Sequence, residues 1–210
     1  MENWTMREWS AKELRAYYQE CLRRDFPPDE RMPLARMEEL TQTGGQVSLG
    51  FYRAGELAAY GVFIKNGREA ALLNYYAVQP QLRGQGVGTA CLGLLRRAAD
   101  QMAAHWIIFE VEAPEDGSTP EETETRNRRV AFYRRGGALA TGVDSVLFGV
   151  HYHIMLLPAA SLGPEPPPPE DRAVRAALED LYRAAITDRP APGLCFQEAC
   201  RVWLRDQKGL

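Results

Sequence analysis

Three glycines in five positions follow an apolar stretch and lead directly into a helical pattern. They are Gly84, Gly86 and Gly88, and Arg83 precedes them. Glycine costs roughly 1 kcal/mol relative to alanine inside regular structure, so a cluster of glycines suggests that another molecule lies close to the backbone. Successive N–H groups at a helix N-terminus, which carries about +0.5 charge, can converge on an anion. This pattern favours a pyrophosphate-binding loop over residues 83–89.

Other uses of a glycine loop fit this stretch less well. A P-loop requires a lysine followed by serine or threonine after the glycines, and that pair is absent here. A dinucleotide fingerprint requires a third glycine where Cys91 stands when the spacing is counted from Gly86. A tight strand-to-helix turn without a ligand stays open as an alternative, although one glycine usually suffices for such a turn.

The elements before the loop are two helices and three strands. Ser10 and Glu13 form a capping-box pattern before apolar residues at helical spacing, and the prolines of "DFPPDERMP" end that helix. A second, short helix is expected over residues 33–42. The strands are "QVSLGFYR", "LAAYGVFIK" and "AALLNYYAV", separated by turns at Ala54-Gly55 and Asn66-Gly67. Asn-Gly between apolar runs indicates a hairpin, so we expect three successive antiparallel strands.

The elements after the loop begin with an apolar helical stripe over residues 87–104 and the strand "WIIFEVEAP". A strand, a helix and a strand in this order predict a right-handed parallel crossover. The acidic segment "PEDGSTPEETET" is expected to be a loop, and "RNRRVAFYRR" a short helix. The stretches "ALATGV" and "FGVHYHIMLL" are expected to form a closing pair of strands.

The composition changes near residue 159, and we divide the chain there. Residues 1–158 form the predicted main domain, and residues 159–170, which include "GPEPPPPED", form an extended proline-rich linker. Residues 171–210 form a helical C-terminal extension. Apolar residues from Val174 to Ile186 keep helical spacing, and this face must bury against the main domain or against another chain. A final helix is expected around "FQEACRVWLRD".

The overall composition is that of a soluble globular protein, with 45% apolar and 25% charged residues. The net charge of −3 gives no sign of nucleic-acid binding, and no stretch approaches the roughly 20 apolar residues of a membrane helix. The first residues lack the pattern of a secretory signal. The four cysteines, Cys21, Cys91, Cys195 and Cys200, form no CxxC pair. We therefore expect a cytoplasmic protein with reduced thiols and without a metal site.

Two motifs together resemble the GNAT acetyltransferase superfamily. The first is Arg83-x-x-Gly86-x-Gly88 preceded by "YYAVQP", and the second is "NRRVAFYRRGGA" about 45 residues later, with a strand between them. The order of elements over roughly residues 8–157 is also similar to that family. The resemblance implies an α/β (α+β) fold with a mixed, mainly antiparallel central sheet flanked by helices. It also implies that acetyl-CoA is the cosubstrate and that an amine is the acceptor.

The resemblance assigns the coenzyme-binding residues by position. These are Ala77, Val78, Arg83, Gly84, Gln85, Gly86, Val87, Gly88, Thr89 and Asn127. In that family the strand before the glycine loop splays from the next strand, and the pantetheine arm enters the gap. The Val78 N–H would then stabilise the oxyanion that develops on the thioester, and Tyr133 would donate a proton to the departing thiolate.

The attacking amine must be neutral, which calls for a general base. Alternation along "IIFEVE" puts Glu110 and Glu112 on one strand face, and both are candidates for this role. His151 and His153 also share a strand face and are candidates for the acceptor pocket or the base. Asp29 and Glu30 are placed to attract a cationic amine.

We therefore expect an N-acetyltransferase that acts by direct attack in a ternary complex, because Cys91 lies within a helix and is poorly placed to carry an acyl group. The acceptor is expected to be the primary amine of a small molecule or a peptide, and a homodimer stays open. The alternative is a catalytically silent acyl-CoA-binding module that regulates a partner through the C-terminal helix.

Overall fold

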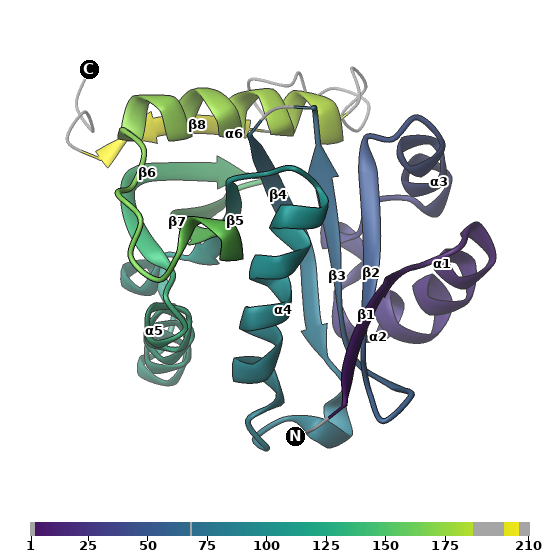
Figure 1. Cartoon of the computed structure of the whole chain (residues 1–210). Coiled ribbons are helices and arrows are strands. Elements are labelled where there is room, and N and C mark those ends of the chain that lie inside the picture. The colour runs from purple at the N-terminus through teal and green to yellow at the C-terminus, as the bar shows by residue number, and fades with distance from the viewer. Residues whose placement is uncertain (1–2, 68, 187–199, 206–210) are drawn as a thin grey trace.

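The computed structural model describes residues 3–67, 69–186 and 200–205. Its strands form one mixed sheet, and helices cover both faces of that sheet (Figure 1). The strands are β1 (Trp4–Glu8), β2 (Gln46–Arg53), β3 (Glu56–Lys65), β4 (Ala70–Val78), β5 (Trp106–Glu112), β6 (Leu139–Leu147), β7 (Val150–Pro158) and β8 (Cys200–Leu204). The α-helices are α1 (Ala11–Tyr17), α2 (Arg23–Asp25), α3 (Leu34–Gln42), α4 (Val87–Gln101), α5 (Pro120–Arg135) and α6 (Asp171–Ala185).

The sheet has the strand order β1-β2-β3-β4-β5-β7-β6-β8. Only β4 and β5 pair in parallel, and the other neighbours are antiparallel. The α4 crossover between β4 and β5 accounts for the parallel pair. The predicted mixed, mainly antiparallel sheet is therefore confirmed.

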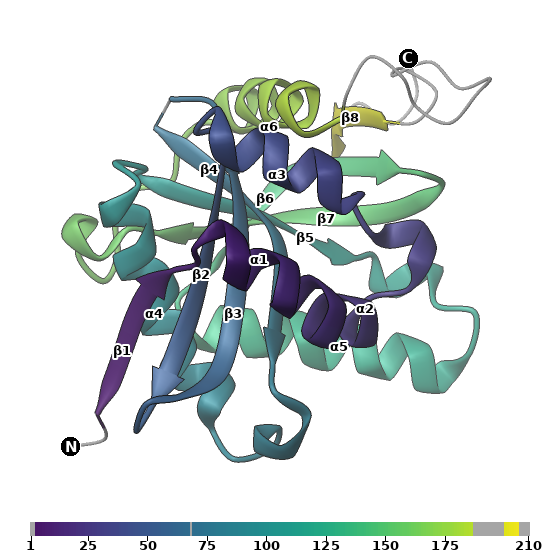
Figure 2. The same cartoon turned by 90° about the vertical axis from the view of Figure 1, so that its right-hand side faces the viewer.

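Two layers of helices bury the two faces of the sheet. Helices α4 and α5 cover one face, where Leu95 and Ile107 belong to the same core cluster. Helices α1, α3 and α6 cover the opposite face (Figure 2). The apolar side of α6 packs on this second face through Leu178 and Leu181, so the C-terminal helix buries against this chain. No helix among the described residues is long and apolar enough to cross a membrane.

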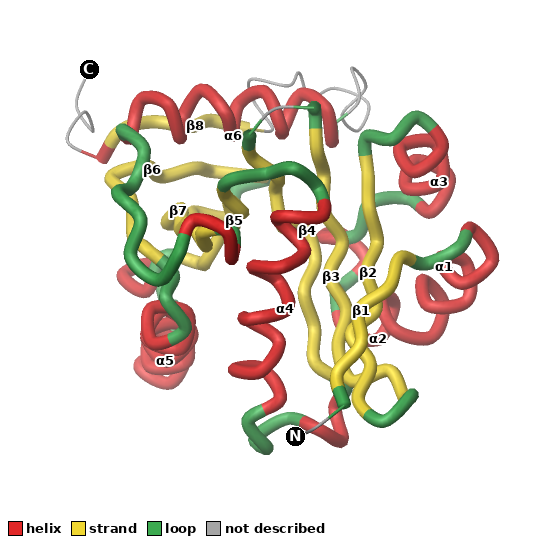
Figure 3. The backbone as a smooth tube through the Cα atoms, in the orientation of Figure 1, coloured by secondary structure: helices red, strands yellow, loops and turns green. Residues whose placement is uncertain are grey.

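Most of the predicted elements are present near their predicted positions. The capping box of Ser10 and Glu13 starts α1, and a π-helical turn at Tyr18–Leu22 carries the chain on to α2. The three predicted antiparallel strands are β2, β3 and β4. The loop from β4 into α4 lies at one end of the sheet (Figure 3).

Two predictions of secondary structure are wrong, and one edge strand was not predicted. Residues Trp4–Glu8 form an edge strand that was not expected. The segment expected as an acidic loop becomes helical at Pro120, because the Thr119 side chain caps α5 by accepting from the Glu122 N–H. The predicted closing pair of strands is present as β6 and β7, and the chain turns between them at Phe148-Gly149, two residues that were predicted to begin the second strand. Of the predicted final helix, Cys200–Leu204 form strand β8, which pairs with β6, and residues 196–199 and 206 lie outside the described residues.

Candidate active site

The glycine loop ends in a helix start that offers unpaired N–H groups. Gly86 is the residue before α4, and Gly84 and Gly86 both have φ of +76°, which disfavours any residue with a side chain. Among the described residues, the amides of residues 84–89 make no backbone hydrogen bond. The side chains of Gln85 and Thr89 are exposed, whereas Val87 is buried in the core. These donors and the α4 dipole form a cradle that suits an anion.

Arg83 contacts protein groups in this structure. Its Nε donates to the Val78 carbonyl at 3.0 Å, and its guanidinium forms an ion pair with the buried Asp25 at 3.0 Å. Its own N–H donates to the Pro80 carbonyl. Arg83 therefore fastens the start of the loop to the end of β4 and to α2.

Strands β4 and β5 part partway along their length. Their parallel pairing covers only Ala70 to Leu72 on β4 and Trp106 to Ile108 on β5. Opposite β3, Tyr75 pairs with Val62 and Leu73 pairs with Phe63, so Asn74 has no residue facing it and forms a bulge. A bulge increases strand twist and redirects the chain, which explains why β4 diverges from β5 after this point.

Backbone N–H groups of β4 point into the gap between the two strands. Gln79 donates to the Ala58 carbonyl at 2.9 Å, and consecutive residues of an antiparallel strand alternate between pairing with the neighbour and pointing away from it. The N–H groups of Val78 and Tyr76 therefore point away from β3 and toward the gap. Ala77 pairs with Tyr60, so its N–H belongs to the sheet.

Tyr133 lies on the α5 side of this gap. Its ring centroid is 4.6 Å from that of Phe109 on β5 and 5.1 Å from that of Phe132. The hydroxyl has no hydrogen-bond partner among the described residues. It lies close enough to the Tyr76 hydroxyl on β4 for a negative charge on Tyr133 to raise the pKa of Tyr76. Burial raises the pKa of Tyr133 to about 12, so the phenol stays protonated.

Gly88 lies where α4 and α5 meet. A Cβ added there would be 3.2 Å from the Phe132 ring, so the glycine permits the close approach of the two helices. Asn127, predicted as a coenzyme contact, is an exposed residue of α5. It lies six residues, about 1.7 turns, before Tyr133, so the two side chains leave α5 in different directions.

Glu110 lies on the opposite face of β5 from Phe109. Its neighbour on that face, Ile108, packs in the cluster under α6, and the Tyr182 hydroxyl of α6 donates a hydrogen bond to Glu110 Oε1. Burial raises the pKa of Glu110 to about 7, although the hydrogen bond from Tyr182 acts in the opposite direction. A carboxyl group with this pKa is suited to exchange protons near neutral pH.

Glu112 has a different environment. It forms ion pairs with Arg129 at 2.8 Å and with Arg126 at 3.3 Å, both from α5. These two ion pairs connect the end of β5 to α5. The structure therefore separates the two predicted bases, with Glu110 suited to proton transfer and Glu112 to holding α5 in place.

Other groups gather on the Glu110 face. The Tyr75 hydroxyl accepts from the Met32 N–H at 2.6 Å and donates to the Glu30 carbonyl at 2.9 Å, which fixes the segment before α3 across β4. Tyr152 on β7 has a raised pKa, first because of burial and then because of the charges of Glu110, Glu30 and Glu112. Arg126 acts in the opposite direction, so this face combines several carboxylates with a nearby guanidinium.

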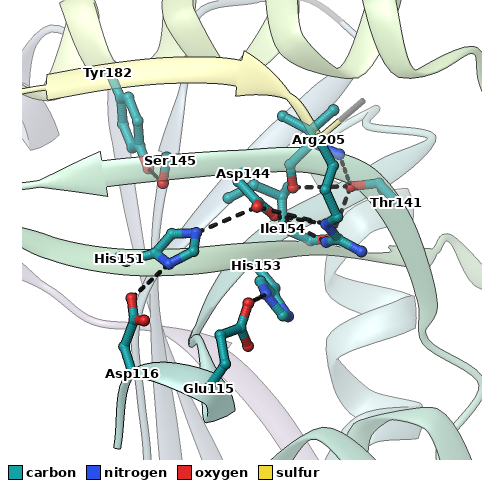
Figure 4. A network of polar contacts seen from close by, with 11 residues as sticks. Glu115, Asp116, Thr141, Asp144, Ser145, His151, His153, Ile154, Tyr182 and Arg205 are labelled. Carbon is teal, nitrogen blue, oxygen red and sulfur yellow. Dashed lines mark hydrogen bonds and ion pairs between the residues drawn. The ribbon is translucent and has the colours of Figure 1, made fainter. Parts of the chain in front are cut away.

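His151 and His153 are not brought together with Glu110. They alternate along β7 with Tyr152 and Ile154, and they share their face with Met155, which packs in the core under α4. They lie instead in a polar network with Asp144, Glu115 and Asp116 (Figure 4). The sequence pattern placed both histidines on one face correctly, but that face is the one opposite Glu110.

Two further features lie outside the predicted site. A surface hollow of about 500 Å³ lies between α4 and the turn after β7, and Gly93, Arg96 and Pro164 are among its lining residues. None of the predicted site residues lines it. Tyr182 was identified in the sequence as part of the apolar face of α6, and nothing in the sequence signalled that its hydroxyl reaches Glu110.

Comparison with protein families gives a match over most of the chain. The profile of the acetyltransferase (GNAT) family matches residues 3–136, which include the glycine loop and Tyr133. A search of curated proteins gives no match.

Solved structures with a similar fold share little sequence with this chain. A GNAT-family acetyltransferase from Bacteroides thetaiotaomicron superposes with a TM-score of 0.66 at 18% identity and covers 87% of this chain and 99% of its own. A chimera of the spermidine N-acetyltransferase SpeG from Vibrio cholerae with hSSAT gives 0.53 at 14% identity, covering 75% and 96%. A ribosomal-protein alanine N-acetyltransferase from Escherichia coli gives 0.51 at 20% identity, covering 74% and 94%. At these identities the likeness supports the fold.

Proposed function

Because this chain belongs to the GNAT acetyltransferase family, we propose that it transfers an acetyl group from acetyl-CoA to a primary amine by direct attack in a ternary complex. The observation that carries the proposal is the junction of the glycine loop with the opening between β4 and β5. The unpaired amides of residues 84–89 suit the pyrophosphate of the coenzyme. The opening lies at the end of the same strand and suits a linear arm that ends in a thioester.

Val78 supplies electrostatic stabilisation in this proposal. Its N–H points toward the opening, as the pairing of Gln79 with Ala58 requires. A fixed donor aimed at a developing oxyanion removes roughly 3 kcal/mol from the barrier. The Val78 carbonyl is held by Arg83, and this contact keeps the peptide in orientation.

Tyr133 supplies the proton donor for the thiolate. With a pKa of about 12 against about 8.5 for a thiol, complete transfer from Tyr133 costs about 5 kcal/mol. A hydrogen bond that strengthens as the sulfur gains charge acts mainly in the transition state and lowers the barrier. We therefore assign Tyr133 a hydrogen-bonding role that need not include full proton transfer.

Glu110 supplies the base. An alkylamine with a pKa near 10 is neutral in about one molecule in a thousand at pH 7, which costs about 4 kcal/mol. Glu110, with a pKa of about 7, is half ionised at that pH, and its Oε2 is not the atom that binds Tyr182. Glu110 and Phe109, whose ring contacts Tyr133, lie on opposite faces of β5. In this proposal the base and the acid therefore act from the two sides of the sheet.

The acceptor in this proposal is an amine that arrives as a cation. Glu30, Glu110 and Glu112 all raise the pKa of Tyr152 while Arg126 lowers it, and this gathering of carboxylates supports a cationic acceptor. The similar solved structures include enzymes named for spermidine, a polyamine that is cationic at neutral pH, and for a ribosomal-protein alanine. Burial raises the pKa of Cys91 to about 12, so this thiol stays protonated and does not serve as an acyl carrier.

Calorimetric titration of coenzyme A into the full chain tests binding, and thiol release from acetyl-CoA with a panel of amines tests transfer. We expect saturable binding at one site and thiol release that depends on an amine. Binding without turnover across polyamines, amino acids and peptides would support the silent acyl-CoA-binding module. Absence of binding would overturn both proposals.

A further inference from the structure

A cluster of two histidines and an aspartate lies on the last strands of the sheet. One donor atom each from Asp144, His151 and His153 can be chosen so that all three lie within 4.8 Å of one another. His151 and His153 are two residues apart on β7, and Asp144 pairs directly with His153 from β6. Alternation and register therefore put all three side chains on one face of the sheet (Figure 4).

The cluster is partly enclosed. The Asp144 side chain is 1% exposed and that of His151 is 11% exposed. The Trp203 ring from β8 stacks on His151 with a centroid distance of 5.5 Å. The Asp144 carboxylate forms an ion pair with Arg205 at 2.8 Å.

We propose that Asp144, His151 and His153 bind a divalent transition-metal ion of the zinc type. Two imidazoles and one carboxylate form a donor set that suits Zn²⁺ and similar ions, whereas Mg²⁺ and Ca²⁺ prefer oxygen ligands alone. Three protein ligands leave a fourth position for water or another ligand. This inference departs from the expectation, based on the cysteines, that the chain has no metal site.

The surroundings of the three side chains match those of metal ligands. A ligating histidine commonly donates its second ring N–H to a carboxylate, which fixes the ring and its tautomer. His151 Nε2 lies 3.2 Å from Asp144 Oδ2, while its Nδ1 lies 2.7 Å from Asp116. His151 is thus oriented by Asp116 on one side and directed toward Asp144 on the other.

Asp144 and His153 are held in a comparable way. Arg205 donates to Asp144 Oδ1 at 2.8 Å and, more weakly, to Oδ2 at 3.5 Å, so the guanidinium orients the carboxylate whose Oδ2 also faces His151. Glu115 binds His153 Nε2 at 2.9 Å. Among the described residues, the carboxylates of Asp144, Glu115 and Asp116 surround the two imidazoles, an arrangement that suits a cation.

Binding requires only a small contraction of the cluster. Ligands at about 2.0–2.1 Å from a tetrahedral ion lie roughly 3.3 Å from one another. The donor atoms therefore need to move together by about an ångström or somewhat more. The segment that carries Glu115 and Asp116 leads into α5, so the ion would join β6 and β7 and fix the loop before the helix that bears Tyr133.

Titration of the metal-free full chain with Zn²⁺, in competition with a chromophoric chelator, measures affinity and stoichiometry. We expect one ion per chain and a rise in Tm when the site is saturated. With Co²⁺ in place of Zn²⁺, we expect d–d absorption without thiolate-to-metal charge transfer, because none of the proposed ligands is a cysteine. A charge-transfer band, or the absence of saturable binding, would overturn the site.

Variants then locate the ion. His153→Ala and Asp144→Asn are expected to weaken Zn²⁺ binding at least 100-fold, and Asp116→Asn about 10- to 100-fold as a residue that orients a ligand. His105→Ala is the matched control, because His105 is the third histidine and lies outside the cluster, with an exposed side chain. Circular dichroism verifies that each variant is folded. Equal affinity of wild type and His153→Ala, or an equal loss in His105→Ala, would contradict the proposal.

Discussion

The hydroxyl of Tyr182 on α6 donates a hydrogen bond to Glu110 on β5, across 72 residues of sequence. On its other side the same hydroxyl lies 3.0 Å from Ser145 Oγ of β6. Burial raises the pKa of Glu110 and the Tyr182 hydrogen bond lowers it, so the value of about 7 results from both. Tyr182 lies beyond residues 3–136, the part of the chain that matches the family profile.

The first prediction concerns Tyr182→Phe. Loss of the hydroxyl removes the contact that lowers the pKa of Glu110, so that pKa should rise further above 7. The acid limb of the pH profile of kcat/KM should move to higher pH, with activity reduced at pH 7 and recovered at alkaline pH. Ser145→Ala is the control, because it removes only the second partner of Tyr182. If the acid limb does not move in Tyr182→Phe, the ionisation that controls the rate is not that of Glu110.

The second prediction concerns stability in Glu110→Gln. A carboxyl group whose pKa is raised by folding binds a proton more tightly in the folded state, so it lowers the free energy of unfolding as pH rises from about 4.5 to about 7. The raised pKa corresponds to at most about 3 kcal/mol above pH 7. Glu110→Gln should therefore be more stable than wild type at pH 8 and similar to it at pH 4.5.

Urea unfolding of both proteins at the two pH values measures this difference. Glu112→Gln is the control, because Glu112 is paired with Arg126 and Arg129 and its loss should lower stability. Equal stability of Glu110→Gln and wild type at pH 8 would show that Glu110 carries no burial cost. The same variant should lose most of its acetyl-transfer activity if Glu110 is the base.

The third prediction concerns Tyr133→Phe. The ring should keep its packing on Phe109, while the hydrogen bond to the departing thiolate is lost. We expect kcat to fall roughly 100-fold or more, the usual effect of losing a general acid. Coenzyme A affinity, measured by calorimetry, should be nearly unchanged.

Tyr76→Phe is the matched control for Tyr133. Tyr76 faces the same core from β4, and its hydroxyl contacts the Gly88 carbonyl at 3.4 Å and the Cys91 thiol. It should retain most of the activity. Similar losses in both variants would show that the effect comes from packing rather than from the Tyr133 hydroxyl.

The fourth prediction compares two glycines of α4. Gly88→Ala brings a methyl group to 3.2 Å from Phe132, so α4 and α5 must separate slightly, and both stability and coenzyme binding should fall. Gly93→Ala meets no atom within 4 Å and should stabilise the protein by up to about 1 kcal/mol through helix propensity. Thermal unfolding and calorimetry distinguish the two. A Gly88→Ala variant as stable as Gly93→Ala would show that the helices do not need this close approach.

The sequence predicts those parts of the fold that depend on local residue patterns, such as tight turns and helix starts. The turns at Gly55 and Gly67 have φ of +86° and +76°, and these glycines set the hairpins that join β2, β3 and β4. The start of α5 was also readable, because Thr119, Pro120 and Glu122 form a helix-start pattern that the acidic composition obscured.

Other parts depend on contacts that no local pattern contains. Strands β1 and β8 are five-residue edge strands that exist because β2 and β6 offer free edges. The distinction between Glu110 and Glu112 depends on which helix each meets, α6 for the former and α5 for the latter. Alternation along the strand predicts only that both side chains share one face, and their different surroundings are decided by partners distant in the sequence.

The opening between β4 and β5 leaves two rows of peptide groups facing each other across a gap in the middle of the sheet. Peptide groups that face each other across a gap can form hydrogen bonds with an extended molecule that carries its own amides. Such a molecule would lie between the rows as a short additional strand. If the gap binds the coenzyme as proposed, its occupancy should slow the hydrogen exchange of the Tyr76 and Val78 amides. In the free protein these two amides should then exchange faster than those paired between β3 and β4.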